Sequence, residues 1–295
     1  MTGESFLTSI TSEKLSADID RFGAQLVALR DSDGRDLQWN GNPAIWKGKA
    51  PILFPIVGAL VGNKYLLDGV AYPMARHGFA RTLPFTPVQV TSSSALLRLG
   101  WDEQTLKVYP FRFELDIRFS LAGSTLDLLA SVKNLETDQP LPASFGFHPA
   151  LRWPLPYGNP RAAHVILFEV EERAPIRRLD SQGLIVPEKF ATPVERKTLR
   201  LRDELFLADA MIFDRIGSRS LRYGATPGPY IEFQFPDTPY LGIWSKPGAE
   251  FVCIEPWHGC ADPQDFTGDF QVKPGIFLVQ PGQAKECRMS ISLCA

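Results

Sequence analysis

The strongest constraint on the fold is a strict alternation of apolar and charged residues from Phe113 to Phe119. Successive side chains of an extended strand point to opposite faces, so this pattern predicts a strand with one buried face and one charged face. After the turn residues 122–124, residues 126–132 repeat the alternation and are the expected hairpin partner. A chain built on such hairpins has to bury its apolar sheet face against a second layer.

The same period recurs along the chain, punctuated by 25 prolines and 23 glycines. With 295 residues, 44% of them hydrophobic, the chain can bury a large core. We therefore predict an all-β fold, a large antiparallel β-sandwich with few short helices, formed by residues 1–295 as one domain. One or two turns of helix are expected at 42–46, with Asn42 as N-cap and Pro43 in the first helical position, and at 102–108. The other expected strands are 15–19, 25–29, 95–101, 165–170, 230–235 and 287–293.

Charge and hydropathy exclude several classes of function. The 31 Lys and Arg are balanced by 33 Asp and Glu without a basic stripe, which argues against nucleic-acid binding. The longest apolar stretch, residues 50–62, is interrupted by Pro51, Pro55 and Gly58 and is too short to span a membrane. The first residues lack the basic and apolar regions of a signal peptide. We expect a soluble, cytoplasmic protein.

No pattern for a metal or a cofactor stands out. Cys253, His258 and Cys260 have a superficial zinc-like spacing, but nothing nearby completes a set of four ligands, so free thiols are expected instead. The chain has no phosphate-binding loop, no glycine-rich dinucleotide motif and no nucleophile elbow. Hydride transfer, nucleotide hydrolysis and serine hydrolase chemistry are therefore disfavoured, and we expect neither a metal nor a cofactor.

Two residues in aromatic and proline-rich clusters are candidates for proton transfer. Glu255 follows an apolar strand and precedes Pro256 and Trp257, a setting that suits an oriented general base. A surface glutamate in a turn is the alternative. His148 lies between Phe147 and Pro149, and proline restricts the preceding residue, so the imidazole has a defined direction. The alternative is a buried histidine bonded to a backbone carbonyl.

A third cluster supplies candidate binding residues. His77 lies between Arg76 and Arg81, and together they offer fixed donors for hydroxyls or an anion. A solvated basic turn is the alternative. Either Phe147 or Trp257 is expected to face the flat, partly apolar side of a sugar ring. Among the remaining histidines, His258 is near the predicted base in sequence, and His164 is expected to be structural.

These clusters resemble the aldose 1-epimerase (galactose mutarotase) family, in particular its smaller, divergent branch. The resemblance spans about two thirds of the chain in family order. Galactose mutarotases usually have Tyr-Phe-Asn after the catalytic histidine, whereas this chain has Pro149-Ala150-Leu151, so the resemblance does not extend to galactose specificity. It is carried by residues 51–55, 76–81, 145–149, 209–213 and 254–257.

The resemblance implies a β-sandwich and a set of roles. By resemblance, His148 and Glu255 exchange protons with the sugar, and His77 and Asp209 bind it, although Asp214 lies only five residues from Asp209. Arg81 is similar to a substrate-contacting arginine of the hexose-phosphate branch.

The resemblance also implies an activity, the interconversion of aldose anomers without a cofactor. The expected partner is an aldose or a sugar phosphate, and the protein is expected to be a monomer or homodimer. Alternatives are a hexose-6-phosphate mutarotase, with Arg76, Arg81, Lys47 or Lys49 on the phosphate, and a non-catalytic sugar sensor. Glycoside hydrolysis is a weaker alternative, because it normally needs two carboxylates.

Overall fold

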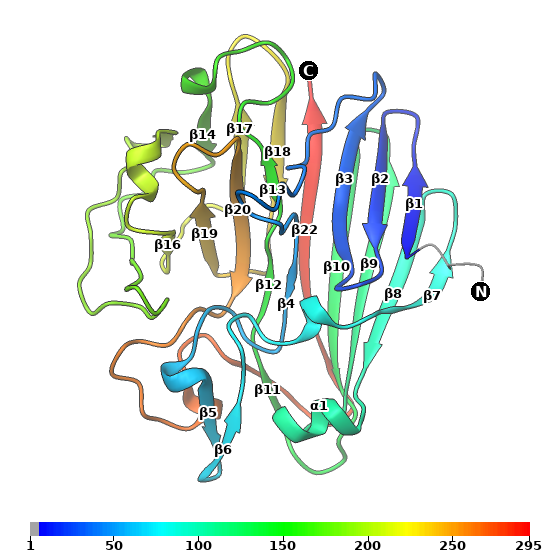
Figure 1. The fold of residues 1–295 in the computed structure, drawn as a ribbon, viewed down its shortest axis with the longest axis vertical. Helices are drawn as coiled ribbons and strands as arrows, with labels where there is room; N and C mark the ends of the chain where they lie inside the picture. Colours follow the sequence, from blue (N-terminus) through cyan, green and yellow to red (C-terminus); the bar gives the residue numbers. More distant parts are fainter. Residues whose placement is uncertain (1–5) are drawn as a thin grey trace.

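The computed structural model describes residues 6–295 and is built almost entirely of antiparallel strands (Figure 1). The first five residues, part of the stretch without a signal-peptide pattern, lie outside the described residues. A nine-stranded sheet dominates, and it contains the predicted hairpin as β9 and β10. Its strands, in spatial order, are β15 (Thr198–Arg200), β14 (Val165–Phe168), β17 (Ser220–Gly224), β18 (Tyr230–Gln234), β22 (Ala284–Cys294), β10 (Thr125–Asn134), β9 (Phe113–Ala122), β8 (Ser94–Gly100) and β7 (Thr86–Val90).

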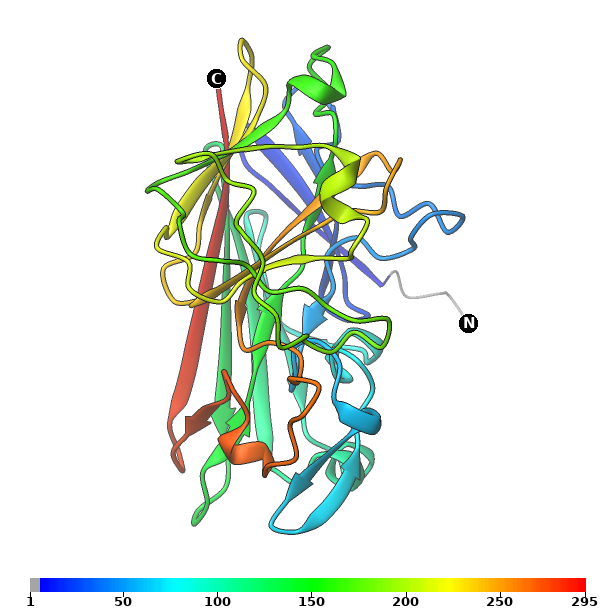
Figure 2. The ribbon, with the colours of Figure 1, turned by 90° about the vertical axis from the view of Figure 1, so that its left-hand side faces the viewer.

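Two further sheets cover the nine-stranded one, and Figure 2 shows them on one side of it. The three-stranded sheet consists of β1 (Leu7–Thr11), β2 (Leu15–Asp20) and β3 (Gln25–Asp31). The six-stranded sheet consists of β16 (Met211–Phe213), β19 (Tyr240–Trp244), β20 (Phe251–His258), β12 (Phe145–Phe147) and β4 (Ile52–Leu53), with β13 (Ala150–Arg152) also paired to β20. The predicted β-sandwich is confirmed.

Short elements complete the chain. Two two-stranded antiparallel pairs are present: the hairpin of β5 (Lys64–Leu67) with β6 (Val70–Pro73), and the long-range pair of β11 (Leu141–Ala143) with β21 (Phe277–Val279). The α-helix α1 (Glu103–Val108) confirms the predicted helix, and the Asp102 carboxylate caps it by accepting from the Gln104 and Thr105 backbone N–H groups. The 3₁₀ turns are η1 (Val61–Asn63), η2 (Ala80–Thr82), η3 (Arg161–Ala163), η4 (Asp203–Phe206) and η5 (Phe270–Val272).

The segment 42–46, predicted to make a turn or two of helix, makes one turn, and the Asn42 Oδ1 atom caps it by accepting from the Ala44 N–H at 3.0 Å. The Asn42 carbonyl accepts from the Ile45 and Trp46 N–H groups, so the segment makes a single turn and then stops. One turn fixes several backbone dihedrals for few hydrogen bonds, and nothing after Trp46 extends it.

The core lies between the layers and draws on strands from both ends of the chain, from Ile10 to Ile291. In β9 and β10 the alternating residues face this core, as the period of two predicts. Strand β20 is different, since seven of its eight residues are buried and it has paired neighbours on both sides. One face of β20 packs on the core, which leaves the other face to build a site. No helix among residues 6–295 has the length and apolar character to cross a bilayer.

Candidate active site

The register around β20 places the two predicted proton-transfer residues side by side. Gly146 of β12 pairs with Trp257 of β20, and the two strands are antiparallel. His148 lies two residues further along one strand and Glu255 two residues back along the other, and β13 resumes the same register beyond them. Side chains two residues apart share a face. The His148 Nε2 and Glu255 Oε2 atoms are consequently 3.1 Å apart.

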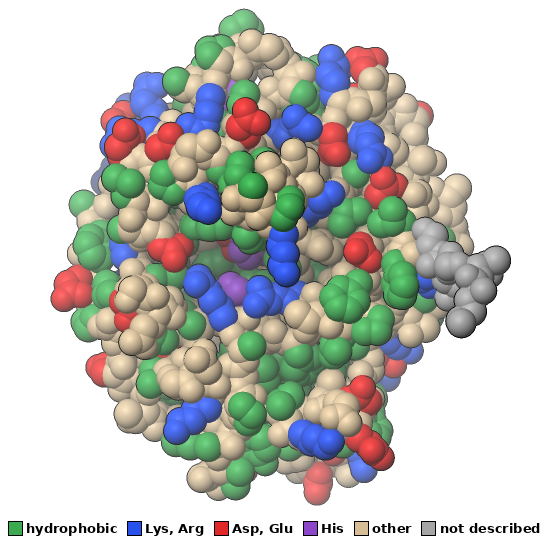
Figure 3. All heavy atoms as spheres, in the orientation of Figure 1, with side chains coloured by type: hydrophobic (Ala, Val, Ile, Leu, Met, Phe, Trp, Pro, Cys, Tyr) green, Lys and Arg blue, Asp and Glu red, His purple; other side chains and the backbone are tan. Residues whose placement is uncertain are grey.

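A cavity of about 460 Å³ opens over this pair. Its size is that of a small-molecule site. In the same orientation as the ribbon, Figure 3 shows a hollow in this face with histidine side chains at its floor and Lys and Arg side chains around it. All seven residues predicted from the sequence line the cavity, namely Glu255, His148, His77, Arg81, Asp209, Arg76 and Trp257.

Burial dominates the electrostatics of the acid and base. It raises the pKa of Glu255 well above its ordinary value, while the positive charge of Arg76 acts in the opposite direction. Burial also lowers the pKa of His148 to about 3, and the charges of Arg76 and Arg81 add to that effect. Desolvation thus disfavours the charged form of each group. Both pKa shifts favour a protonated carboxyl and a neutral imidazole, so the pair carries one mobile proton, with Glu255 Oε2 and His148 Nε2 3.1 Å apart.

His77 is fixed as a hydrogen-bond donor toward the cavity. Its Nδ1 accepts from the Gly58 backbone N–H at 3.1 Å, so the neutral ring carries its proton on Nε2. Burial, with the nearby His148 and two arginines, holds the pKa of His77 well below its ordinary value, which keeps the ring neutral. The His77 backbone has φ of 67°, in the left-handed region, and its N–H donates to the Gly58 carbonyl. Such strain is characteristic of functional positions.

Gly78 lets the chain make this approach. Its φ is 71°, and a Cβ at this position would lie 2.1 Å from the Phe54 carbonyl oxygen. That oxygen accepts from the Phe79 and Ala80 N–H groups and so anchors the segment that carries His77. A side chain at Gly78 would therefore displace the His77 segment from β4.

Arg76 and Arg81 both line the cavity. The Arg81 guanidinium is anchored to the backbone, because its Nη2 donates to the Arg76 carbonyl at 2.8 Å. Burial lowers the pKa of Arg81, with a further contribution from the charge of Arg76. The Arg81 Nε is buried without a partner among the described residues, so it has a donor free for a ligand.

Asp209, rather than Asp214, lines the cavity. Asp209 also has a left-handed backbone, with φ of 60°, and its carbonyl accepts from Arg178 Nη1 at 2.9 Å. Asp214 instead pairs with Arg177, with an Nη1–Oδ2 distance of 3.5 Å. The geometry therefore favours Asp209 over its neighbour as a ligand for hydroxyl groups.

Of the two rings predicted to face the sugar, Trp257 lines the cavity and Phe147 does not. Phe147 is fully buried in the main core, on the side away from the cavity. Two glycines make room for the Trp257 indole. A Cβ at Gly146 would lie 2.6 Å from its Cδ1 atom, and one at Gly242 would lie 2.4 Å from its Cη2 atom.

Comparison with known proteins identifies the family. Residues 7–264 match the sequence model of aldose 1-epimerase. The chain belongs to the aldose 1-epimerase family. It is 30% identical over 281 residues to the plasmid-encoded protein LacX of Lactococcus lactis subsp. lactis, covering 92% of this chain and 94% of that one.

Two solved structures share the architecture almost completely. A galactose mutarotase related enzyme from Lactobacillus acidophilus has a TM-score of 0.90 at 28% identity, covering 98% of this chain and 97% of that one. A galactose mutarotase-like protein from Lactobacillus casei has a TM-score of 0.90 at 26% identity, covering 98% and 100%.

In this aldose 1-epimerase family member, two aromatic residues at the site were missed from the sequence. The Trp46 ring stacks on His148, with centroids 5.3 Å apart, and the Trp244 ring meets His148 edge-on at 6.1 Å. Both line the cavity. The only sequence signal at Trp46 was the helical pattern at 42–46. That pattern does not indicate that the Trp46 ring stacks on His148.

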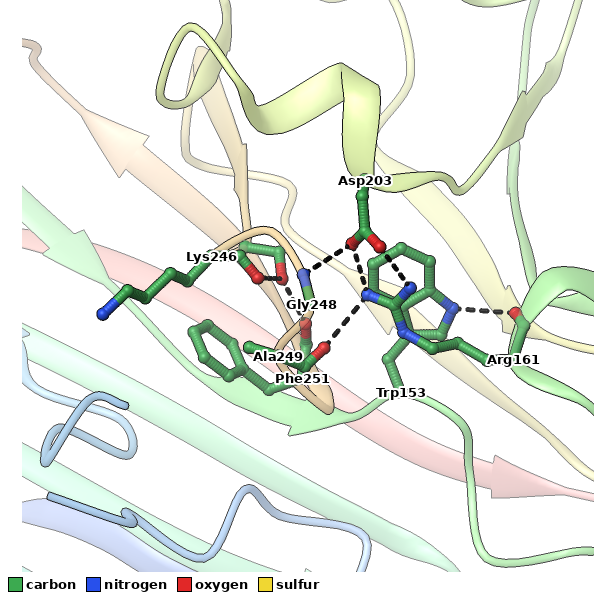
Figure 4. Close-up of polar contacts among 8 residues, drawn as sticks. Trp153, Arg161, Asp203, Lys246, Gly248, Ala249 and Phe251 are labelled. Atoms are coloured by element: carbon green, nitrogen blue, oxygen red, sulfur yellow. Dashed lines mark hydrogen bonds and ion pairs between the residues drawn. The ribbon is translucent and has the colours of Figure 1, made fainter. Parts of the chain in front are cut away.

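A polar network braces the cavity rim formed by the β19–β20 turn (Figure 4). Asp203 of η4 accepts from the Gly248 N–H and pairs with Arg161, which also donates to the Ala249 carbonyl. The Arg161 guanidinium lies 3.4 Å above the Trp153 ring centroid. At the rim itself, Lys246 donates from Nζ to the Ile45 carbonyl and so ties the Trp46 turn to this hairpin. Sequence reasoning did not identify this brace.

A buried ion pair supports the loop that follows Gly58. Lys273 Nζ lies 3.2 Å from Asp262 Oδ1, and their side chains are 1% and 4% exposed. The Asp262 carboxylate accepts from the Val61 N–H, and its own N–H donates to the Ala59 carbonyl. These bonds fix the loop that begins at Gly58, the partner of His77.

The other two histidines lie outside the cavity. His164 is buried, and its Nε2 accepts from the Leu155 N–H, so its predicted structural role is supported. His258 is on the opposite face of β20 from Glu255, and its ring packs edge-on against Phe277. His258 therefore also lies on the opposite face of β20 from Cys253, which argues against the zinc-like site suggested by the spacing of Cys253, His258 and Cys260. All four cysteines are free.

His258 should make the protein acid-sensitive. Burial, with the charge of Lys285, lowers the pKa of His258 from 6.5 to about 4. Below 6.5 the unfolded chain binds a proton that the folded chain does not, so stability falls as the pH drops from 6.5 toward 4. We expect His258→Gln to lose less thermal stability than the wild type over this range, measured by circular dichroism melts. Equal losses of stability in the wild type and the variant would contradict the assignment of the acid sensitivity to His258. His164, which is unchanged in both proteins, does not affect the comparison.

Proposed function

We propose that the protein interconverts the α and β anomers of an aldose. The observation that carries this proposal is the 3.1 Å contact between His148 Nε2 and Glu255 Oε2 on the wall of a sugar-sized cavity. Membership of the aldose 1-epimerase family supports it. A buried acid and base within reach of one small molecule are the groups that ring opening requires.

The proposed reaction needs one proton donated to the ring oxygen of the sugar and one proton removed from its C1 hydroxyl. With the mobile proton on His148, Glu255 removes the proton of the C1 hydroxyl while His148 protonates the ring oxygen, and the C1–ring oxygen bond breaks to give an aldehyde. Rotation about C1–C2 and closure on the other face reverse both transfers. Both oxygens are bonded to C1, so an acid and a base 3.1 Å apart can reach them together. The pair ends with the proton count it began with, and the step therefore consumes no cofactor.

The remaining cavity residues hold the sugar in this proposal. The His77 Nε2–H and the Arg81 guanidinium donate to sugar oxygens, and the Asp209 carboxylate accepts from hydroxyls. Trp257 provides an apolar face, and Trp46 and its stacking on His148 restrict the direction of the imidazole. Such positioning is the main way in which a fixed site assists a reaction that already proceeds in water.

A phosphorylated hexose is a second candidate substrate, favoured by the positive charges at the cavity. Arg76, Arg81 and Lys246 all line it. The lysines suggested by the sequence are not part of this group, because Lys49 Nζ donates to the Val27 carbonyl and Lys47 is absent from the lining. Arginine recognises phosphate through paired donors, which gives Arg76 and Arg81 a clear role in this alternative.

Polarimetry tests both candidates. We expect the protein to accelerate the equilibration of freshly dissolved α-glucose, α-galactose or glucose 6-phosphate above the rate in buffer. If the phosphate is bound, Arg76→Met should raise KM roughly tenfold or more for glucose 6-phosphate, with a smaller change for glucose, because a charge-assisted bond is lost. Lys47→Met, a change on the exposed side of the turn, is the matched control.

The same assay distinguishes a sugar sensor. A sensor would bind an aldose in calorimetry without accelerating anomer exchange, and that result would reject the proposed activity.

A further inference from the structure

Cys253 adds a third ligand-type side chain to the acid and base. It is two residues before Glu255 on β20, so both side chains project from the same face of the strand. One ligand atom each from His148, Cys253 and Glu255 lie within 4.8 Å of one another, and all three residues are buried. The anomerisation proposed above uses the imidazole and the carboxylate but gives the thiol no task.

The spacing of the nitrogen and oxygen atoms matches that of two ligands of one metal ion. Bonds of about 2.0–2.2 Å from a tetrahedral metal to a nitrogen and an oxygen put those two ligands about 3.3 Å apart. The corresponding distance here, from His148 Nε2 to Glu255 Oε2, is 3.1 Å. The geometry of that contact is not that of a directed hydrogen bond, and Glu255 Oε2 has no well-aligned donor among the described residues, although the Trp257 side chain interacts with the carboxylate. A buried carboxylate oxygen without a well-aligned donor is a group that a cation would satisfy.

The ligand types select the class of cation. One sulfur, one nitrogen and one oxygen favour a borderline or soft ion such as Zn²⁺ or Cd²⁺ over Mg²⁺ or Ca²⁺. Three protein ligands leave a fourth position, as in zinc sites that bind water or an exogenous ligand. That position would face the cavity, because His148 and Glu255 line it and Cys253 lies behind them.

We propose that His148, Cys253 and Glu255 form a binding site for a thiophilic divalent cation, with Zn²⁺ as the physiological candidate, and that an occupied site blocks anomerisation. Binding takes the thiol proton and the mobile proton of the acid–base pair into solvent, and bonds form from the metal to sulfur, nitrogen and oxygen. Without its proton and with both groups coordinated, the pair has neither an acid nor a base to offer. The inhibition rests on the proposed function, whereas the binding does not.

Cadmium reports the site directly, because a thiolate bound to Cd²⁺ gives an ultraviolet charge-transfer band. We expect the full chain, freed of metal by a chelator, to develop this band with one equivalent of Cd²⁺. The variant Cys253→Ala should lack the band and bind Zn²⁺ at least roughly tenfold more weakly in competition with a chelator, since a direct ligand is worth no less than an outer-shell one. Cys260→Ala, a buried cysteine beyond the end of the same strand, should behave like the wild type.

Activity provides the second readout. Zn²⁺ should inhibit anomer equilibration by the wild type and by Cys260→Ala, with relief by chelator, while Cys253→Ala should stay active at the same concentration. A wild type without the band, or a Cys253→Ala variant that binds as tightly as the wild type, would overturn the site. A band without inhibition would overturn the blocking role. If the wild type has no anomerase activity, the cadmium band still decides the site, so the two proposals fail separately.

Discussion

Replacing Glu255 with glutamine is expected to lower kcat for anomer equilibration by about 10²–10⁴-fold, the usual contribution of a positioned proton-transfer group. Glutamine keeps the shape of the side chain but has no carboxylate to take the C1 hydroxyl proton. His148→Asn should lose a similar factor. Because both residues act in the same pair of proton transfers, kcat of the double variant should be only slightly lower than that of either single variant. Polarimetry at saturating sugar measures all three.

The controls separate chemistry from folding. Glu250→Gln changes an exposed residue directly before β20, and His258→Asn changes a histidine on the other face of that strand, so both should keep wild-type rates. Thermal melts check that each variant is folded. Wild-type rates in folded Glu255→Gln and His148→Asn would show that the assigned roles are wrong.

Removing the buried ammonium group with Lys273→Met should destabilise the fold by about 3–5 kcal/mol, the usual cost of leaving one member of a buried ion pair alone. The Asp262 side chain is 4% exposed, so its charge would have no water to replace the lysine. The same change should loosen the loop at Gly58 that orients His77. Urea denaturation measures the loss in the free energy of unfolding.

A second substitution tests the electrostatic explanation. Asp262→Asn in the Lys273→Met background removes the unpaired charge but retains an oxygen that can accept from the Val61 N–H, so it should recover much of the lost stability. Lys64→Met, at an exposed lysine nearby in sequence, should change stability by less than about 0.5 kcal/mol. No recovery in the double variant would mean that packing by the lysine stem, rather than its charge, stabilises this region.

Local pattern was enough to predict much of the sheet structure. The alternation at 113–119 predicts the strand and its exposed face, and the turn that follows predicts its hairpin partner. Each of these features depends on neighbouring residues alone. The pairing of sheets was not predictable in this way. Strand β22, at the end of the chain, lies between β10 and β18, and nothing in its own residues specifies those neighbours. The turn at 42–46 and its Asn42 cap were likewise predictable from local residues, but the stacking of Trp46 on His148 was not.

The site residues were predictable because they fall in recognisable short clusters, and their resemblance to a family supplied the pairing. All seven line one cavity. Register, rather than any local signal, puts His148 opposite Glu255. Trp244, Ser245 and Lys246 escaped detection because a strand end and a tight turn carry no chemical pattern of their own. They become part of the site only through the fold of β19 against β20.

The separation between the β20 ladder and the loops above it has an evolutionary consequence. Of the two proposed proton-transfer groups, Glu255 sits on β20 and His148 between β12 and β13, both of which pair in register with β20 or its neighbours in the interior, where a shift of one residue would move every side chain to the wrong face. The residues at the mouth come from turns that tolerate insertion and exchange. If the proposed reaction holds, sugar preference can diverge among descendants of one ancestor by loop replacement, while the groups that carry out the reaction are inherited unchanged.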